Sequence, residues 1–270
     1  MRYLHIFSAG LILFCHSSAG IIDKILLKKH YKYFKLKRKN FDNVKFITRK
    51  GFTVIFDPKI KSPIIVSYEL KAEDTIIKVE RASQGAFKPD PTIGIEYQAT
   101  KKDYKGSGWH KGHLAPSNDM RRCEEIQRES FYFTNIVPQH PSLNTVHWAR
   151  LEKLANNYAQ TYKKIHIITG PIYSIPLPDG KFYKTIGKSK LKIPTWFYKV
   201  IIKQNESNDK LDVLSFMMPN KKLCPKIELE EFFTPIVTIE DSAQLNLLRK
   251  DSVEPSLLMV KEIPEKLWRY

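Results

Sequence analysis

The chain has 270 residues, of which 42% are hydrophobic and 27% are charged. These values are ordinary for a soluble globular protein with one substantial core. The chain contains no internal repeats, and no stretch beyond its N-terminus is apolar for long enough to span a membrane. Lysine and arginine number 45 against 28 acidic residues, which gives a net charge of +17. Such a charge attracts polyanions, and it favours nucleic acid over an anionic membrane surface.

Residues 1–19 have the pattern of a secretory signal peptide. Arg2 provides a basic start, residues 6–15 form an apolar run, and small residues at 17–19 predict cleavage after Ala19. A secreted or periplasmic protein is therefore expected. The alternatives are a buried N-terminal helix and a mitochondrial presequence. The presequence is less favoured because it would be richer in arginine and amphipathic.

Residues 20–43 form a basic arm in which lysines and one arginine are interleaved with apolar residues. Ile22, Ile25, Leu26 and Lys29 follow helical spacing, which predicts a short amphipathic helix. This helix could lie on nucleic acid or on an anionic membrane. The arm could also be a solvated segment with a few anchors in the core, and the sequence leaves these alternatives open.

From residue 44 onward, short apolar runs bounded by turn residues replace the helical pattern. Aromatic and β-branched residues predict strands at 52–56, 63–68, 76–79, 165–169, 195–203 and 211–218. Apolar residues three and four apart predict a helix at 145–164 and a closing helix at 236–248. Groups of strands with few helices, and no long linker, predict a single α+β domain over residues 44–270.

Two histidines and a lysine follow a Gly-Ser-Gly turn at 106–108. A histidine such as His113 has a pKa near neutrality and is the usual group for taking a proton from water. Gly112 allows the backbone to bend or to be approached closely, so that the side chain of His113 can project freely. Taken alone, a short histidine pair is more often a polar surface feature than a catalytic site.

A second candidate site lies in the predicted helix. Asn144, Trp148 and Glu152 are four residues apart and fall on broadly one helical face, with a drift of about 40° per step. An amide oxygen and a carboxylate on one face suit a hard cation that keeps most of its water, as Mg²⁺ does. The alternative is that Asn144 caps the helix and Glu152 is a solvated charge.

Asn135 and Arg81 are weaker candidates. Asn135 belongs to an apolar run that ends in proline, and a strand there could deliver its side chain to a site. Arg81 precedes a chain break at Asp90-Pro91 and, viewed alone, is an ordinary surface arginine. After cleavage two cysteines remain, at positions 123 and 224, and whether they form a disulfide stays open.

In their order along the chain these segments resemble the DNA/RNA non-specific endonucleases of the endonuclease G type. The matching motifs are His-Lys-Gly-His at 110–113, Asn-Ile-Val-Pro-Gln at 135–139 and Asn-x-x-x-Trp-x-x-Leu-Glu at 144–152. The resemblance runs from about residue 44 to residue 248. Each motif alone is a weak signal, but an ordered set at compatible spacing is specific. The resemblance implies a ββα-metal (His-Me finger) fold, with a central antiparallel sheet flanked by helices.

The resemblance also implies a mechanism. His113 matches the general base that deprotonates water for attack on phosphorus. Asn144 matches the direct protein ligand of a single Mg²⁺, for which Mn²⁺ could substitute. Glu152 matches a carboxylate that holds metal-bound water. The reaction needs no 2′-hydroxyl, so both DNA and RNA are expected as substrates.

The same resemblance implies that three further residues contact the substrate. Arg81 is the best match for an arginine that holds the phosphate, Lys111 occupies a second phosphate-binding position, and Asn135 is expected to contact the substrate. Arg81 and Lys111 are also expected to assist catalysis. Contacts to the backbone rather than to the bases should dominate affinity. Relatives of this kind are often homodimers, so pairing of two copies is a further expectation.

The chain departs from the family pattern at two positions, where His110-Lys111 replaces Asp-Arg. Lys111 keeps the positive charge but lacks the two-pronged donor geometry of arginine. His110 replaces an anion by an imidazole, and this affects the activity of the site and its pH optimum. An active metal-dependent hydrolase of phosphodiester bonds is expected. The main alternative is a catalytically impaired protein on the same scaffold that only binds nucleic acid.

Overall fold

We describe the protein from a computed structural model that covers residues 43–204 and 211–248. The predicted signal peptide and nearly all of the predicted basic arm lie outside these residues. Among the described helices, none is both long and apolar enough to cross a membrane. Cys123 and Cys224 are both free, so the disulfide alternative is not realised.

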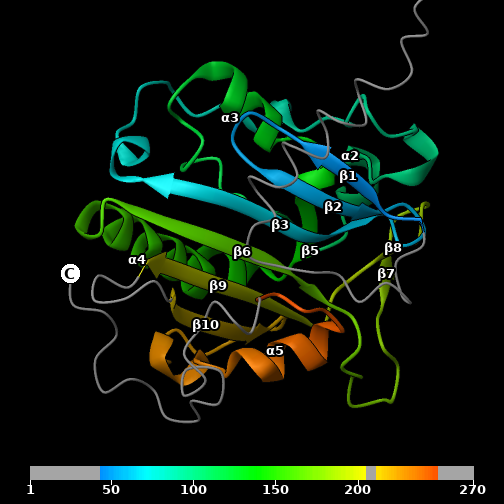
Figure 1. Ribbon diagram of the computed structural model, residues 1–270. Coiled ribbons are helices and arrows are strands. Elements are labelled where there is room, and N and C mark those ends of the chain that lie inside the picture. Colours follow the sequence, from blue (N-terminus) through cyan, green and yellow to red (C-terminus); the bar gives the residue numbers. More distant parts are fainter. Residues whose placement is uncertain (1–42, 205–210, 249–270) are drawn as a thin grey trace, which may run out of the picture.

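A six-stranded antiparallel sheet runs through the centre of the molecule, in the order β1-β2-β3-β6-β9-β10 (Figure 1). Its strands are β1 (Lys45–Thr48), β2 (Thr53–Asp57), β3 (Ser62–Lys71), β6 (Lys164–Ile172), β9 (Trp196–Gln204) and β10 (Leu211–Pro219). Aromatic and β-branched residues dominate these segments, as pleated and buried strands require. The prediction of an α+β protein with a central antiparallel sheet is confirmed.

Helices cover both faces of this sheet, which explains why its strands are apolar on both sides. On one face lies α4 (Trp148–Thr161), whose buried residues include Leu151, Leu154 and Tyr158. On the other face lies α5 (Ile236–Ala243), which Figure 1 places next to the β10 edge. The two resulting cores are separated by the sheet, and alternate residues of β6 and β9 contribute to one or the other.

Two short strands and α4 form a ββα unit beside the large sheet. The strands β4 (His110–His113) and β5 (Ile136–Gln139) pair antiparallel, and a π-helical turn (Leu143–His147) leads from β5 into α4. The remaining helices and strands are α2 (Lys101–Tyr104), α3 (Glu124–Ser130), β7 (Thr185–Ile186) and β8 (Leu191–Lys192). The Gly-Ser-Gly turn before β4 requires its glycines, because Gly106 and Gly108 both adopt positive φ angles, of 69° and 79°.

The predicted strand at 76–79 is wrong. Ile76 and Ile77 are each 59% exposed, and the segment pairs with no strand of the described chain. Instead, the amides of Lys78 and Val79 both donate to the carbonyl oxygen of Arg121, at 3.1 Å. An apolar, β-branched run forms a strand only where a neighbouring strand accepts its hydrogen bonds, and none lies here among the described residues.

The predicted closing helix at 236–248 is too long at its C-terminal end. The helix α5 ends at Ala243 because Gln244 adopts a left-handed conformation with φ of 56°. The amides of Leu247 and Leu248 then donate to the carboxylate of Glu240, at 2.6 and 3.0 Å. The leucines after the helix are buried in the core beneath α5, so their apolar spacing reflects packing and not helical structure.

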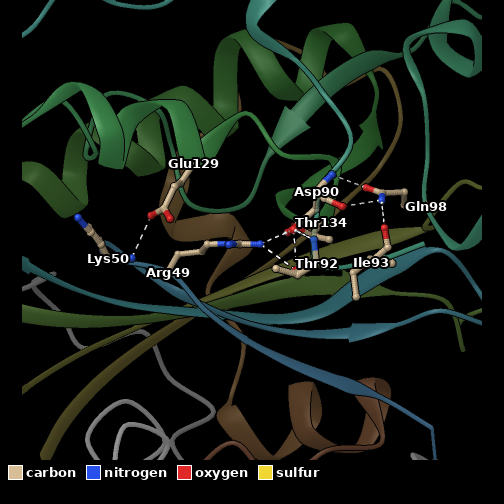
Figure 2. A network of polar contacts seen from close by, with 8 residues as sticks. All are labelled: Arg49, Lys50, Asp90, Thr92, Ile93, Gln98, Glu129 and Thr134. Atoms are coloured by element: carbon tan, nitrogen blue, oxygen red, sulfur yellow. Dashed lines mark hydrogen bonds and ion pairs between the residues drawn. The ribbon is translucent and has the colours of Figure 1, made fainter. Parts of the chain in front are cut away.

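A buried carboxylate joins three segments that are distant in the sequence (Figure 2). Asp90 accepts hydrogen bonds from Arg49 at the end of β1, from Thr92 in its own loop and from Thr134 just before β5. Gln98 closes the loop by bonding to the amide and carbonyl of Asp90, at 2.6 and 2.9 Å. Burial alone would raise the pKa of Asp90, but its hydrogen bonds outweigh burial and lower the pKa below its usual value.

We expect Asp90→Asn to reduce the free energy of unfolding by about 3 to 5 kcal/mol, because it leaves the buried Arg49 without its counter-charge. Denaturant titration followed by circular dichroism measures this loss. The matched control is Asp179→Asn, which removes an exposed ion pair with Lys181 and should leave the unfolding midpoint unchanged. Equal losses in both variants would contradict a special role for Asp90.

The same carboxylate predicts a pH dependence. The pKa of Asp90 is lower in the folded than in the unfolded protein, so its ionised carboxylate stabilises the folded state. This stabilisation is fully present above the pKa of the unfolded state and is lost as pH falls through the pKa of the folded state. The difference in unfolding free energy between wild type and Asp90→Asn should therefore be full at neutral pH and should narrow below about pH 4. A difference that widens on acidification would contradict this account.

Candidate active site

A cavity of about 380 Å³ opens between β4, the start of α4 and the loop that contains Arg81. Its lining brings together five of the six residues predicted to form a site, together with His110. The lining residues are Arg81, Phe87, Trp109, His110, Lys111, His113, Pro116, Ser117, Asn118, Asn144 and Glu152. The segments that carry them are up to 71 residues apart in sequence, so the cavity exists only in the folded chain.

The strand β4 positions His113 at the inner end of the cavity, where it pairs with Ile136 of β5. Two aromatic rings hold the imidazole: Phe87 lies 5.3 Å away, and Phe131 contacts it edge-on at 5.0 Å, centroid to centroid. The Nε2 atom of His113 is buried and has no hydrogen-bond partner among the described residues. The two aromatic rings therefore fix the orientation of the imidazole at the cavity.

Burial lowers the pKa of His113 to about 3, and the positive charge of Arg81 contributes to the shift. The imidazole is therefore neutral at physiological pH and can accept a proton. A bound phosphate would bring negative charge next to the ring, and such charge raises the proton affinity of an imidazole. The environment therefore keeps His113 unprotonated until an anionic ligand arrives.

Gly112 is required for a close approach between the two strands that position His113. A Cβ atom at Gly112 would come within 2.3 Å of the Gln139 side chain on β5. No real Cβ makes such a contact, so a larger residue would push β4 away from β5 and displace His113. The expectation that Gly112 permits close backbone approach is confirmed.

The π-helical turn carries Asn144 to the cavity. Four residues of α-helix turn by about 40° more than a full circle. The wider π turn rotates less per residue and offsets this drift, which places Asn144 and Glu152 on the same cavity. The Nδ2 atom of Asn144 lies 3.2 Å from Nδ1 of His110. The alternative that Asn144 caps the helix is wrong, because its side chain makes no capping bond there.

Glu152 lies one turn into α4 and is only partly exposed at the cavity. Burial raises the pKa of Glu152 to about 8. The charge of Lys199 opposes this shift, Asp119 adds to it, and Arg81 opposes it. The alternative that Glu152 is a solvated surface charge is therefore wrong. Asp119 accepts hydrogen bonds from Tyr68, at 3.0 Å, and from the amide of Asn156, at 2.9 Å, so it is a fixed part of the same polar cluster.

Lys199 is a buried cation that the sequence reading missed. It lies in β9 on the face that packs against α4, it is fully buried, and its Nζ lies 4.8 Å from the ring centroid of Trp148. Burial lowers the pKa of Lys199, whereas Glu152 and Asp119 raise it. A lysine is almost never fully buried unless it has a counter-charge. A lysine in the middle of the apolar run at 195–203 was the available sequence signal.

Arg81 and Lys111 both reach the cavity. Arg81 donates to the hydroxyl of Ser117 at 3.0 Å, which orients its guanidinium near His113 and Glu152. The amide of the next residue, Ala82, is held by the side chain of Gln127 at 2.8 Å. The Nζ atom of Lys111 lies 5.0 Å from the ring centroid of Phe87, a favourable cation–π contact. Two positive charges therefore border the cavity.

Asn135 does not contact the cavity, and its predicted role in substrate binding is wrong. It is fully buried, and its amide bonds to both backbone groups of Ala115, at 2.9 Å each, and to the carbonyl oxygen of Ser130, at 2.8 Å. No polar atom of Asn135 is left to meet a ligand. Because Ala115 follows His113 by two residues, Asn135 instead holds the segment that leaves the site.

The sequence model of one family matches most of this chain: that of the DNA/RNA non-specific endonucleases, over residues 32–253. Endonuclease G of Bos taurus is 33% identical over 205 residues, which cover 73% of this chain and 67% of the bovine protein. The nuclease EXOG of Danio rerio is 32% identical over 195 residues, which cover 70% of this chain and 57% of that protein.

A solved structure has the same fold. The crystal structure of the complex between EndoG and its inhibitor EndoGI matches with a TM-score of 0.72 and 26% sequence identity. The match covers 84% of this chain and 94% of that chain. The expected ββα-metal nuclease fold is therefore confirmed, and so is the resemblance that the ordered motifs indicated.

The prediction of a secreted or periplasmic protein is wrong. The matching relatives are named as mitochondrial nucleases, including those of Homo sapiens, Saccharomyces cerevisiae and Schizosaccharomyces pombe. The prediction relied on the apolar run at 6–15, which lies outside the described residues. Short apolar runs occur in several kinds of N-terminal segment, so hydrophobicity alone did not discriminate between destinations.

We expect Asn135→Ala to lower the free energy of unfolding by about 2 to 4 kcal/mol, because three hydrogen bonds are lost and their buried partners stay unsatisfied. The matched control is Asn118→Ala, which removes an exposed amide from the cavity wall and should leave the unfolding midpoint unchanged. Denaturant titration compares the two. An Asn135→Ala variant as stable as wild type would contradict the scaffold role.

Proposed function

This chain belongs to the DNA/RNA non-specific endonuclease family and is a hydrolase of phosphodiester bonds, and we propose that His113 is the general base that activates its attacking water. The observation that carries this proposal is the placement of His113. Its neutral imidazole is clamped between aromatic rings, with an unpartnered Nε2 atom, in the cavity that Asn144 and Glu152 also line.

The reaction follows from this geometry. A ring nitrogen of His113 accepts a proton from water as the water oxygen forms a bond to phosphorus. The bond between phosphorus and the leaving oxygen breaks, and the leaving oxygen takes a proton from solvent. Arg81, held by Ser117, and Lys111 offset the charge of the phosphate in the cavity. Lys111 acts as a point charge, because a lysine offers no planar pair of donors.

The donor set at the cavity fits a hydrated divalent cation. Asn144 would hold the ion through its amide oxygen, and Glu152 would hold water molecules bound to it. A cage of three or more histidine, cysteine or acidic side chains does not occur among the described residues, and an open site of this kind suits an ion that keeps most of its water. When bound, the ion supplies charge that stabilises the phosphate and the leaving oxygen.

The alternative of a protein that only binds nucleic acid accounts poorly for the cavity. Binding through phosphates needs positive charge, but it needs neither a clamped neutral imidazole nor a carboxylate beside an amide. His113, Asn144 and Glu152 come together in one cavity from three successive elements, β4, the π-helical turn and α4, and this supports a catalytic role. The replacement of the family aspartate by His110 leaves this arrangement intact.

We further propose DNA and RNA as substrates, cut without regard to sequence, since Arg81 and Lys111 at the cavity offer contacts to phosphate, which carry no sequence information. A mitochondrial location is proposed on the strength of the relatives' names. Formation of a homodimer stays a prediction.

We expect purified protein to degrade plasmid DNA and single-stranded RNA with Mg²⁺ or Mn²⁺, and a chelator to abolish the activity. His113→Ala should lower kcat/KM by about 10²- to 10⁴-fold, the usual contribution of a general base. The matched control is His166→Gln. His166 lies in β6 and contacts the hydroxyl of Ser67 at 2.7 Å, and its replacement should change kcat/KM by less than about threefold. Undiminished cleavage by His113→Ala would exclude the proposed base.

Binding should weaken steeply with salt, because a chain of charge +17 displaces counterions from the phosphate backbone. With His113→Ala, which binds without cutting, the log–log slope on duplex DNA should be about −0.9 for each phosphate neutralised. Lys111→Met should reduce the magnitude of the slope by about one phosphate contact, whereas Lys181→Met, at an exposed ion pair away from the cavity, should not. An affinity that does not change with salt concentration would exclude electrostatic binding to the phosphate backbone.

A further inference from the structure

His110 and Asn144 meet at the cavity although they come from different elements. His110 is the first residue of β4, and Asn144 lies in the π-helical turn before α4. The Nδ1 atom of His110 lies 3.2 Å from the amide nitrogen of Asn144. The imidazole is otherwise exposed, and within the described residues this contact with Asn144 is the one hydrogen bond of its side chain.

We propose that His110 is a second direct ligand of the divalent ion, beside Asn144, and that it makes the site prefer Mn²⁺ over Mg²⁺. This inference rests on the proposed function, since it assigns a further residue to the ion at the same cavity. It concerns a position at which this chain differs from the family pattern, so the consequence is particular to this chain.

The spacing of the two side chains fits a shared ion. Octahedral Mg²⁺ holds its ligands at about 2.1 Å, so two neighbouring ligand atoms are about 3 Å apart. The 3.2 Å between the His110 and Asn144 side chains is close to that separation. Rotation of the Asn144 amide by half a turn exchanges its nitrogen and oxygen and directs Oδ1 to the side that Nδ1 of His110 faces.

The chemistry of the ligands decides the preferred ion. Carboxylate, carbonyl and water oxygens suit both Mg²⁺ and Mn²⁺, whereas an imidazole nitrogen suits ions of the first transition row. Of the two ions only Mn²⁺ belongs to that row, so a nitrogen ligand favours Mn²⁺ over Mg²⁺. An aspartate at position 110, as in the family pattern, would keep the site purely oxygen-based. With His110 the two protein ligands are one oxygen and one nitrogen, and the remaining positions stay open to water and phosphate. The replacement therefore alters ion selectivity while it leaves His113 and Glu152 in place.

A second imidazole near the same rim serves as an internal control. His140 follows β5, and its Nδ1 accepts a hydrogen bond from the amide of Ser142, at 3.2 Å. Its ring meets Trp109 edge-on at 5.8 Å, and it is not among the residues that line the cavity. His140 is therefore a matched imidazole close to the cavity but outside its lining.

The test measures binding of Mn²⁺ alone to the full chain, in the absence of substrate. Electron paramagnetic resonance gives the dissociation constant, and its electron spin echo modulation detects an imidazole nitrogen bound to Mn²⁺. We expect the nitrogen signal in wild type and His140→Asn, and its loss in His110→Ala and His110→Asp. In competition with Mg²⁺, His110→Asp should lower the preference for Mn²⁺ at least tenfold, with circular dichroism spectra matching wild type.

Two outcomes would overturn the inference, and they differ in what they say of the proposed site. If Asn144→Ala abolishes Mn²⁺ binding while His110→Ala changes neither affinity nor the nitrogen signal, His110 is not a ligand and the ion site at Asn144 stands. If neither variant changes Mn²⁺ binding, the ion binds elsewhere and the metal site of the proposed function falls as well.

Discussion

The buried carboxylate of Asp90 holds together the segments that build the cavity. It joins the end of β1, through Arg49, to the residue before Asn135, through Thr134. Asn135 in turn bonds to Ala115, two residues after His113. The loop that contains Asp90 also carries Phe87, which packs against the imidazole of His113. The position of the candidate base therefore depends on a short series of buried polar contacts that starts at one ion pair.

Burial shifts the pKa values of two neighbouring groups in the cavity, and in both it favours the uncharged form. Burial and a nearby cation keep His113 neutral, so that it can accept a proton. Burial also raises the pKa of Glu152, to about 8, although the buried cation Lys199 acts in the opposite direction and favours the ionised form. A neutral imidazole therefore lies beside a carboxyl group that holds its proton more tightly than usual, and a bound cation would favour the ionised form of that group. Neither effect is visible in the local sequence of either residue.

The errors of prediction have a common cause. The run at 76–79 has strand-like composition, but no described strand lies beside it, and its amides bond to Arg121 instead. Asn135 follows a pattern typical of a strand that delivers a polar side chain, but folding turns the amide inward to the Ala115 backbone. In both cases the local composition fits a strand, but the hydrogen-bond partner that the segment meets in the folded chain is remote in sequence.

The sequence by itself determined which chemistry was available: a histidine after a glycine, an amide and a carboxylate eight residues apart on one helix, and a strongly positive net charge. It also determined the apolar, β-branched runs that predict strands and the helical spacing that predicts α4, because composition and periodicity are local properties. Only the tertiary structure decided which polar residues reach the cavity. His110 meets Asn144 across 34 positions and Arg81 meets Ser117 across 36. Lys199 of β9 is buried and acts on Glu152 through its charge without lining the cavity. Such contacts are set by the packing of whole elements, and no local pattern encodes them.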